Sequence, residues 1–387
     1  MQAQQAKVFA VWLDLIRGLA ALTVFIGHAR VILISSIVVA AGRADIAFKP
    51  AALGEADNRT GFGHIAVIVF FVLSGYLVGG GAVRALRNNR WSASNYAIAR
   101  LSRLWTVLIP VLLLGYLLDH TGVALAVPGS LYSAPPTQRM VFPDLPEAMR
   151  FPNLIANLFF LQSIVARPFG TNSPLWTLSY EFWFYVAFPF LLFMLHPSTT
   201  LVRRVLCAVM LALIAAFVGQ KICTYFVLWL LGVAVEIAPK KLEPKQAKSA
   251  AVLGSIGFVL LLLFLIKANL SLLVSDAIES ICFALLCYAI VHLQQPARTG
   301  LVTSASSGLS AMSYTLYLAH APILVFISSL LMPVWRPWTV NPIGLVKFGL
   351  TVLAVFLLSA GLYWLFERRT PHVRKWMTAL YERARPR

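Results

Sequence analysis

Long apolar segments recur along the chain, separated by shorter polar or basic stretches. A membrane-spanning helix needs about 20 mainly apolar residues, and by this criterion the pattern predicts about ten spans. We expect them at residues 16–40, 64–83, 104–119, 174–195, 205–219, 222–238, 250–267, 272–293, 309–332 and 343–366. The fold class predicted is therefore an all-α integral membrane protein.

The stretch 205–238 fits either one long helix or two short helices broken at Gly219-Gln220-Lys221. Arg203 and Arg204 precede it, and a lysine cluster at 240–248 follows it. Cytoplasmic loops carry an excess of Lys and Arg, so both basic clusters stay cytoplasmic only if the chain crosses the membrane there and back. We therefore predict two helices, and with them cytoplasmic N- and C-termini.

The composition excludes a soluble globular enzyme, because 59% of the residues are hydrophobic and 12% are charged, against roughly 25% charged in soluble domains. The net charge of +18 leaves nucleic acid, anionic lipid or an anionic substrate as partners. No nucleic acid is expected, because basic binders carry their cations on hydrophilic surfaces, whereas here they lie between apolar runs. Cytoplasmic retention, including that of the basic tail 367–387, accounts for most of the charge.

One long polar insertion, residues 120–172, is predicted to lie outside the cytoplasm and is rich in proline. Its apolar patch, Leu154 to Val165, is expected to be an interfacial or re-entrant segment over a cavity. The four cysteines lie in apolar stretches without ligand spacing, so neither a metal site nor a disulfide framework is expected. Asp14 and Arg17 interrupt the first apolar run, which indicates a retained membrane helix rather than a signal peptide.

Several ionisable residues fall inside the predicted spans. Asp14 and Arg17 lie at the inner end of the first span, and His28 lies roughly 17 Å deeper. His320 is expected roughly 16 Å from the cytoplasmic face, and Glu181 about 20 Å from it. These two histidines and the glutamate are thus predicted at one depth, and intramembrane ionisable residues mark functional sites by default.

Structural interpretations remain open beside the functional ones. A membrane histidine can be a hydrogen-bonded core residue, and the aromatic residues around Glu181 also suit an interfacial belt. Arg100 and Arg103 share one helix face, which fits a phosphate clamp or cytoplasmic retention alone. The other histidines are expected to be structural: His64, His120, His196, His292 and His372.

Five short motifs follow one another along the chain. They are Leu13–Ala21 with ten residues between Arg17 and His28, Phe70–Leu77, Arg100–Leu104, Pro174–Phe182 and Ser313–His320. Together they resemble the acyltransferase 3 family of bacterial membrane proteins over essentially the whole chain. Two departures are visible: Trp105 stands where the family usually has a proline, and Phe366–Pro371 resembles its Glu-Arg-Pro ending with an insertion.

The resemblance implies one transmembrane acyltransferase domain, residues 1–387, in the bacterial cytoplasmic (inner) membrane. It implies transfer of an acyl group, commonly acetyl, from cytoplasmic acyl-CoA to a hydroxyl of a glycan or lipid-linked glycan, such as a surface or exported polysaccharide. Acetyl-CoA is then a co-substrate, and no metal is expected. Many relatives carry a fused esterase-like domain, which this chain is expected to lack. Membrane lipids are expected as partners, and a homo-oligomer is left open.

The same resemblance suggests roles for particular residues. His28 is expected to act as general base or to accept the acyl group transiently, and Glu181 to orient or charge-balance the site. Arg17 and Asp14 would hold the first span, and Arg100 and Arg103 would bind the CoA phosphates. Contacts to the substrate are expected from His320, Tyr317, Ser74, Trp176 and Tyr180.

Two other classes of protein remain as alternatives. A proton-coupled secondary transporter or glycan flippase would use His28, Glu181 and His320 for proton coupling. Such transporters tend to show repeat symmetry and broken helices at the midplane, and neither is visible in the sequence. In a non-catalytic membrane scaffold, the buried charges would be structural only.

Overall fold

The computed structural model describes residues 8–34, 62–133, 145–239, 241–268, 270–293 and 301–384. Helices make up 82% of it, and no strand occurs in these ranges, which confirms the all-α prediction. The chain divides into two compact units. Unit 1 comprises Met1–Ala20, His64–Tyr96 and Thr177–Ala311, and unit 2 comprises Ala21–Gly63, Ala97–Trp176 and Met312–Arg387.

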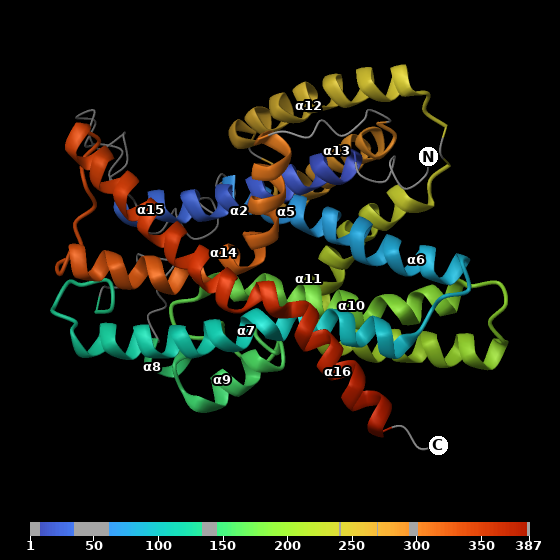
Figure 1. The fold of residues 1–387 in the computed structure, drawn as a ribbon, viewed down its shortest axis with the longest axis horizontal. Helices are drawn as coiled ribbons and strands as arrows, with labels where there is room; N and C mark the ends of the chain where they lie inside the picture. The colour runs from blue at the N-terminus through green and yellow to red at the C-terminus, as the bar shows by residue number, and fades with distance from the viewer. Residues whose placement is uncertain are drawn as a thin grey trace. The chain divides into compact units, whose positions relative to one another are not determined.

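Nine helices in the described part of the chain are long and apolar enough to cross a membrane, against about ten predicted. The difference is α11 (Leu201–Ile237), which joins the predicted spans 205–219 and 222–238. Gly219 interrupts it with φ 80° and ψ 170°. Cys223 Sγ lies 3.8 Å from the Ala215 carbonyl oxygen, although eight residues of straight helix extend about 12 Å. The axis therefore bends sharply at the predicted break (Figure 1).

Unit 1 contains the bent helix α11 and the helices that precede and follow it in the sequence. It holds α5 (Phe62–Ser74), the π-helical turn η2 (Gly75–Gly79), α6 (Gly80–Arg87), α10 (Trp176–Leu195), α11, α12 (Pro244–Lys267) and α13 (Leu272–Val291). Trp229 of α11 is 0% exposed. Its ring packs against Phe188 at 5.1 Å and Phe226 at 5.7 Å between centroids. Aromatic side chains supplied by α10 and α11 therefore build part of the core of unit 1.

Two glycines allow α11 to cross the π-helical turn at backbone contact. A Cβ atom on Gly75 would lie 2.0 Å from the Trp229 carbonyl oxygen, and one on Gly232 would lie 1.9 Å from the Val72 carbonyl oxygen. Arg84 and Glu236 form an ion pair beside this crossing. The Phe70–Leu77 motif thus has a packing function, because only glycine lets the two backbones approach so closely.

Unit 2 contains half of α2 (Val8–Leu33) and most of α7 (Ala93–Ala124) and α14 (Leu301–Leu331). Its other elements are α8 (Leu145–Ala148), α9 (Phe151–Leu158), η3 (Ser173–Leu175), α15 (Pro342–Leu365), η4 (Glu367–Arg369) and α16 (Thr370–Ala384). Helix α7 extends beyond the predicted span 104–119 at both ends, and on the N-terminal side alanine, leucine and arginine residues favour its continuation. The predicted basic tail forms η4 and α16. Residues 35–40 of the first predicted span lie outside the described residues.

A buried aspartate fastens the loop that follows α7. Asp119 is 1% exposed and accepts hydrogen bonds from Thr171 N and Oγ1, both at 2.8 Å, and from Tyr132 Oη at 3.2 Å. Burial and the Asp119 carboxylate raise the pKa of Tyr132, so this hydroxyl remains a donor. Gly170 has φ +59°, and a Cβ there would meet Asp119. Of the predicted patch Leu154–Val165, only the beginning is helical, as α9.

Candidate functional site

His28 of α2 and His320 of α14 form a hydrogen-bonded pair in unit 2. Their Nδ1 and Nε2 atoms, respectively, are 2.8 Å apart, and the rings stack with centroids 5.1 Å apart and an interplanar angle of 21°. His320 is 0% exposed, whereas His28 is partly exposed. Both histidines are predicted at one depth, and the structure brings them into direct contact, with His28 as the more exposed member.

The hydrogen bonds assign the ring protons. His320 Nδ1 lies 3.0 Å from the Leu316 carbonyl oxygen, and a carbonyl only accepts, so neutral His320 carries its proton on Nδ1. Its Nε2 is then an acceptor, and His28 Nδ1 must donate to it. Neutral His28 consequently has an unprotonated Nε2 with a lone pair. The pair therefore presents a base at the more exposed of its two rings.

The surrounding residues hold this pair in place. The rings of Phe25 and Tyr317 lie 5.8 and 6.1 Å from the His320 ring, and Tyr317 Oη donates to the Pro174 carbonyl at 3.4 Å. This contact involves two of the matched motifs. Tyr317, predicted to touch the substrate, thus links α14 to η3.

A proline in α14 explains a second link to this helix. Pro322 has no N–H, so the carbonyl of Leu318, four residues earlier, lacks its usual helical partner. Asn172 Nδ2 donates to this carbonyl at 2.8 Å. Asp119 of α7 accepts a hydrogen bond from Thr171, the residue before Asn172. The segment before η3 is therefore hydrogen-bonded both to α7 and to α14, and in α14 the contact is at Leu318, two residues before His320.

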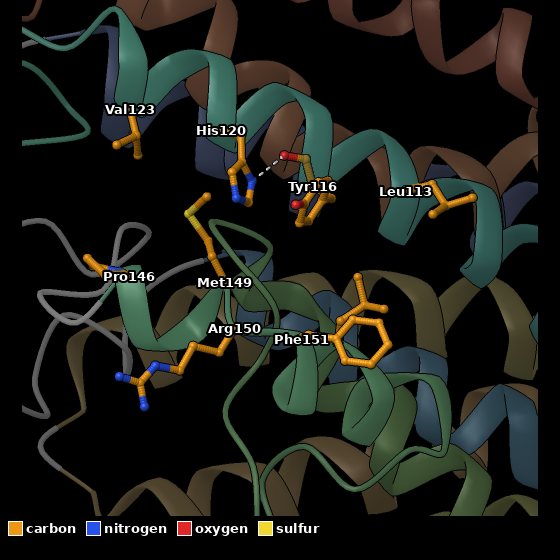
Figure 2. A pocket seen from close by; sticks show the side chains of 9 residues that line it. Leu113, Tyr116, His120, Val123, Pro146, Met149, Arg150 and Phe151 are labelled. Carbon is orange, nitrogen blue, oxygen red and sulfur yellow. Dashed lines mark hydrogen bonds between the residues drawn. The ribbon is translucent and has the colours of Figure 1, made fainter.

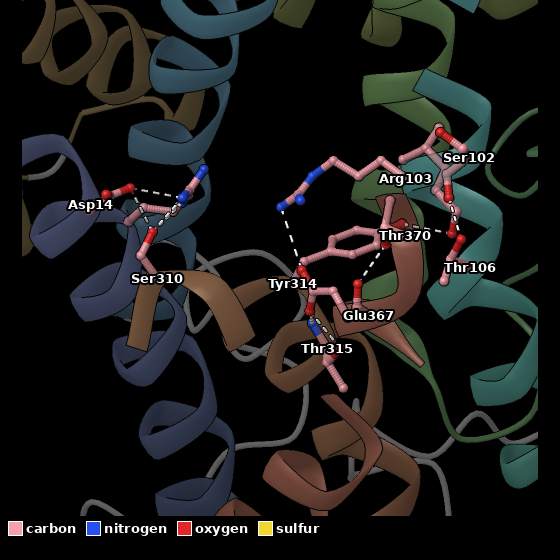
Figure 3. Close-up of polar contacts among 11 residues, drawn as sticks. Asp14, Ser102, Arg103, Thr106, Ser310, Tyr314, Thr315, Glu367 and Thr370 are labelled. Carbon is pink, nitrogen blue, oxygen red and sulfur yellow. Dashed lines mark hydrogen bonds and ion pairs between the residues drawn. The ribbon is translucent and has the colours of Figure 1, made fainter. Parts of the chain in front are cut away.

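Asp14 and Arg17 form a closed polar cluster with Ser310 in unit 1 (Figure 3). Arg17 Nη2 donates to Asp14 Oδ1 at 2.9 Å, and Arg17 Nε donates to Ser310 Oγ at 2.8 Å. Ser310 Oγ in turn donates to Asp14 Oδ1 at 2.9 Å. The cluster joins α2 to α14, and the role of Asp14 and Arg17 in holding the first span stays a prediction.

Arg103 contacts the turn that follows α15 (Figure 3). Its Nη2 lies 3.6 Å from Glu367 Oε1, and its guanidinium lies over the Tyr314 ring at 5.4 Å from the centroid. Glu367 is 5% exposed and also accepts hydrogen bonds from Thr315 N at 3.0 Å and Oγ1 at 2.6 Å. Arg103 therefore already has an anionic partner within the protein, Glu367. A phosphate bound to Arg103 would have to share the guanidinium with this carboxylate. Arg100 lies three residues earlier on α7, partly exposed.

The remaining predicted residues lie mostly in unit 1. Ser74 is hydrogen-bonded to Tyr185 Oη and to Trp229 Nε1, each at 3.1 Å. The Tyr180 ring stacks on Phe71 with centroids 6.2 Å apart. Both side chains therefore contribute to the core of unit 1, and their contact with substrate stays a prediction.

Glu181, partly exposed, follows Tyr180 on α10 in unit 1, while Trp176 begins α10 and belongs to unit 2. The predicted convergence of Glu181 with the two histidines stays a prediction, as does the role of Trp176 in substrate binding.

Two residues of these clusters were missed by the sequence analysis. Glu367 belongs to the weak Phe366–Pro371 signature, which was a usable signal for it. Ser310 stands among several serines before the fifth motif, and nothing in the sequence distinguishes it.

A cavity of about 710 Å³ lies in unit 2, between α7 and the segment from α8 to α9 (Figure 2). Tyr116 and His120 of α7 face Met149 and Phe151 across it (Figure 2). His120 Nδ1 is hydrogen-bonded to the Tyr116 carbonyl at 2.9 Å, and Arg150 lies at the side of the cavity. The lining is mostly apolar, with a few polar groups.

Long apolar helices in the described part of the chain, two of which carry a hydrogen-bonded histidine pair, indicate a multi-pass membrane protein. Residues 10–364 match the family model of acyltransferase 3, described as an acyltransferase domain, so the chain belongs to this family and is a membrane acyltransferase. The match runs through both units. Comparison with curated proteins and with solved structures gave no significant match.

Proposed function

We propose that this acyltransferase moves an acetyl or another short acyl group from cytoplasmic acyl-CoA to a hydroxyl of a glycan, at the bacterial cytoplasmic membrane. The acceptor would be a surface or exported polysaccharide, or its lipid-linked form. The observation that carries the proposal is the chain of hydrogen bonds from His28 through His320 to the Leu316 carbonyl. It leaves a basic lone pair on the accessible histidine, which acyl transfer to a hydroxyl requires.

In this mechanism His28 Nε2 takes the proton of the acceptor hydroxyl as its oxygen attacks the thioester carbonyl. The carbon–sulfur bond breaks, and the CoA thiolate leaves and receives the proton from His28. His320 Nε2 accepts from His28 Nδ1–H throughout, so it stabilises the imidazolium and fixes the ring, as the carboxylate of a catalytic triad does. If His28 carries the acyl group transiently, the same lone pair attacks the thioester first.

The donor would be held through its phosphates by Arg100 and Arg103. Arginine suits this role because its planar guanidinium binds phosphate through two parallel hydrogen bonds. The ion pair between Arg103 and Glu367 would weaken when a phosphate binds to Arg103. Arg17, already engaged by Asp14 and Ser310, would position α2 rather than contact the donor.

The acceptor would be selected on the side of the 120–172 loop, to which the cavity beside α7 belongs. The apolar lining of this cavity suits the lipid part of a lipid-linked glycan, and His120 and Arg150 are polar groups available to its head. Most ligand pockets combine an apolar lining with a few polar groups in this way.

The purified full chain in detergent, given acetyl-CoA labelled in its acetyl group, should release CoA and transfer label to added glycan. A transporter or a scaffold would leave acetyl-CoA intact, so absence of CoA release under conditions where the protein is folded contradicts the proposal. Mass spectrometry of surface glycans from cells with and without the gene would then identify the acceptor.

Arg100→Ala and Arg103→Ala should each raise the KM for acetyl-CoA by about 10-fold or more, because each removes a charged hydrogen-bond donor to phosphate. Initial-rate kinetics of CoA release measure this. Arg90→Ala, at an exposed arginine on the same predicted side, should leave KM unchanged. Glu367→Gln discriminates further: if it raises KM as much as Arg103→Ala does, Arg103 serves only to hold Glu367, and the phosphate clamp is wrong.

A further inference from the structure

A second group of titratable side chains meets in unit 1 and includes no residue of the proposed mechanism. Asp276 of α13 is 1% exposed. Its Oδ1 lies 2.8 Å from His64 Nε2 of α5, and its Oδ2 accepts a hydrogen bond from Tyr225 Oη of α11 at 2.7 Å. Both carboxyl oxygens are thus engaged, which indicates that Asp276 is ionised and that His64 Nε2 carries a proton.

A second carboxyl group lies beside it. Glu279 follows Asp276 by three residues on α13, so the two share one helix face. Glu279 is 2% exposed, and its Oε1 has no hydrogen-bond partner among the described residues. Its carboxyl interacts electrostatically with Asp276 and with Tyr225. A buried polar atom without a hydrogen-bond partner in the described part of the chain, in a carboxyl group that interacts with an ionised neighbour, indicates a site for something small.

The charged groups around the Asp276–Glu279 pair determine which small ligand this site can bind. Among the described residues, the carboxyl pair is faced by the titratable side chains of His64 and Tyr225. Tyr180 of α10 lies behind Tyr225, with the two ring centroids 5.7 Å apart. Helix α12, which also packs on α13, brings Phe258 against Phe283. One histidine balances one carboxylate at most. Within the ranges that the structure describes, an ionised Glu279 inside a membrane-spanning helix would have no cation of its own to balance it, which favours a proton on Glu279.

We propose that Asp276, Glu279, His64 and Tyr225 form an intramembrane proton-binding site, in which Glu279 holds the exchangeable proton and His64 is the point of access. His64 has 16% of its side chain exposed, against 2% for Asp276, so it is the more accessible partner of this ion pair. A proton fits better than a metal ion, because no group of three or more His, Cys, Asp or Glu in the described part of the chain is arranged to hold one. The proposal does not depend on the acyl acceptor or donor.

Infrared difference spectroscopy of the full chain in detergent tests this site at neutral pH. The wild-type protein should show a carbonyl band of a protonated carboxyl group that shifts in D₂O, and Glu279→Gln should remove it, since glutamine replaces the protonated acid with little change in shape. Glu382→Gln, at an exposed position of α16, should leave the band in place. A band that survives in Glu279→Gln, or is missing from the wild-type protein, overturns the proposal.

Two further measurements separate a proton from other occupants. Raising NaCl at constant pH should not change the band, and its loss on adding salt would mean that the site binds a metal cation instead. His64→Gln should slow the exchange of the carboxyl proton for deuterium, whereas unchanged exchange would overturn the access through His64. If Glu279→Gln cannot be purified, Asp276→Asn serves: removing the neighbouring charge should move the disappearance of the band to lower pH, and no movement contradicts the site.

Discussion

His28→Ala is expected to lower the kcat of acyl transfer by a factor of roughly 100 to 10,000, the usual contribution of a positioned general base. The KM for acetyl-CoA should change little, because the arginines rather than the histidine would hold the donor. His372→Ala, in the exposed helix α16, is the matched control and should retain full kcat. Full activity in a well-folded His28→Ala protein would exclude His28 both as base and as acyl carrier.

His320→Leu should show an intermediate loss of kcat, since it removes the acceptor that orients His28 Nδ1–H without removing the base itself. The pH dependence of kcat should change as well, because the imidazolium of His28 would lose its partner. A residue that only fills the core would lower the thermal stability and leave the pH profile of the folded fraction unchanged. The two readouts therefore distinguish an orienting histidine from a structural one.

The sequence predicted that these histidines share a depth, but not that they touch. Depth follows from the helical rise of about 1.5 Å per residue, which any helix obeys. Contact depends on which helices are neighbours and which faces they turn to each other. Which faces meet is determined by the packing of α2 against α14, two segments nearly 300 residues apart in the chain. The residue pattern within either helix alone does not predict this packing.

The same distinction explains the other successes and omissions. The break at Gly219 was predictable, because glycine next to polar residues interrupts an apolar run and its φ of 80° suits glycine. Ser310 was not, because its importance comes from the approach of Arg17 and Asp14 on another helix. The two-unit division was also not predicted, since α2, α7 and α14 each continue from one unit into the other within a single helix.

Gly75→Ala is expected to destabilise the protein strongly. Its Cβ would lie 2.0 Å from the Trp229 carbonyl oxygen and 3.2 Å from Gly232 Cα. These are backbone atoms, so no side-chain rotation relieves the clash, and α11 must move away from η2. Overpacking of this kind costs about 1–3 kcal/mol, and occasionally more. Gly232→Ala, which meets the Val72 carbonyl oxygen and the Tyr76 nitrogen from the other side, should behave the same way.

Thermal unfolding of the purified protein in detergent measures the effect, with Gly257→Ala as the control. Gly257 lies within α12, and a Cβ there would meet nothing within 4 Å. Alanine should therefore leave the melting temperature unchanged or raise it, because it is about 0.5–1 kcal/mol better than glycine inside a helix. Equal melting temperatures for Gly75→Ala and Gly257→Ala would mean that α11 and η2 do not cross at backbone contact. Since Gly75 lies in the Phe70–Leu77 motif, a large loss would assign that motif to packing within unit 1 rather than to chemistry.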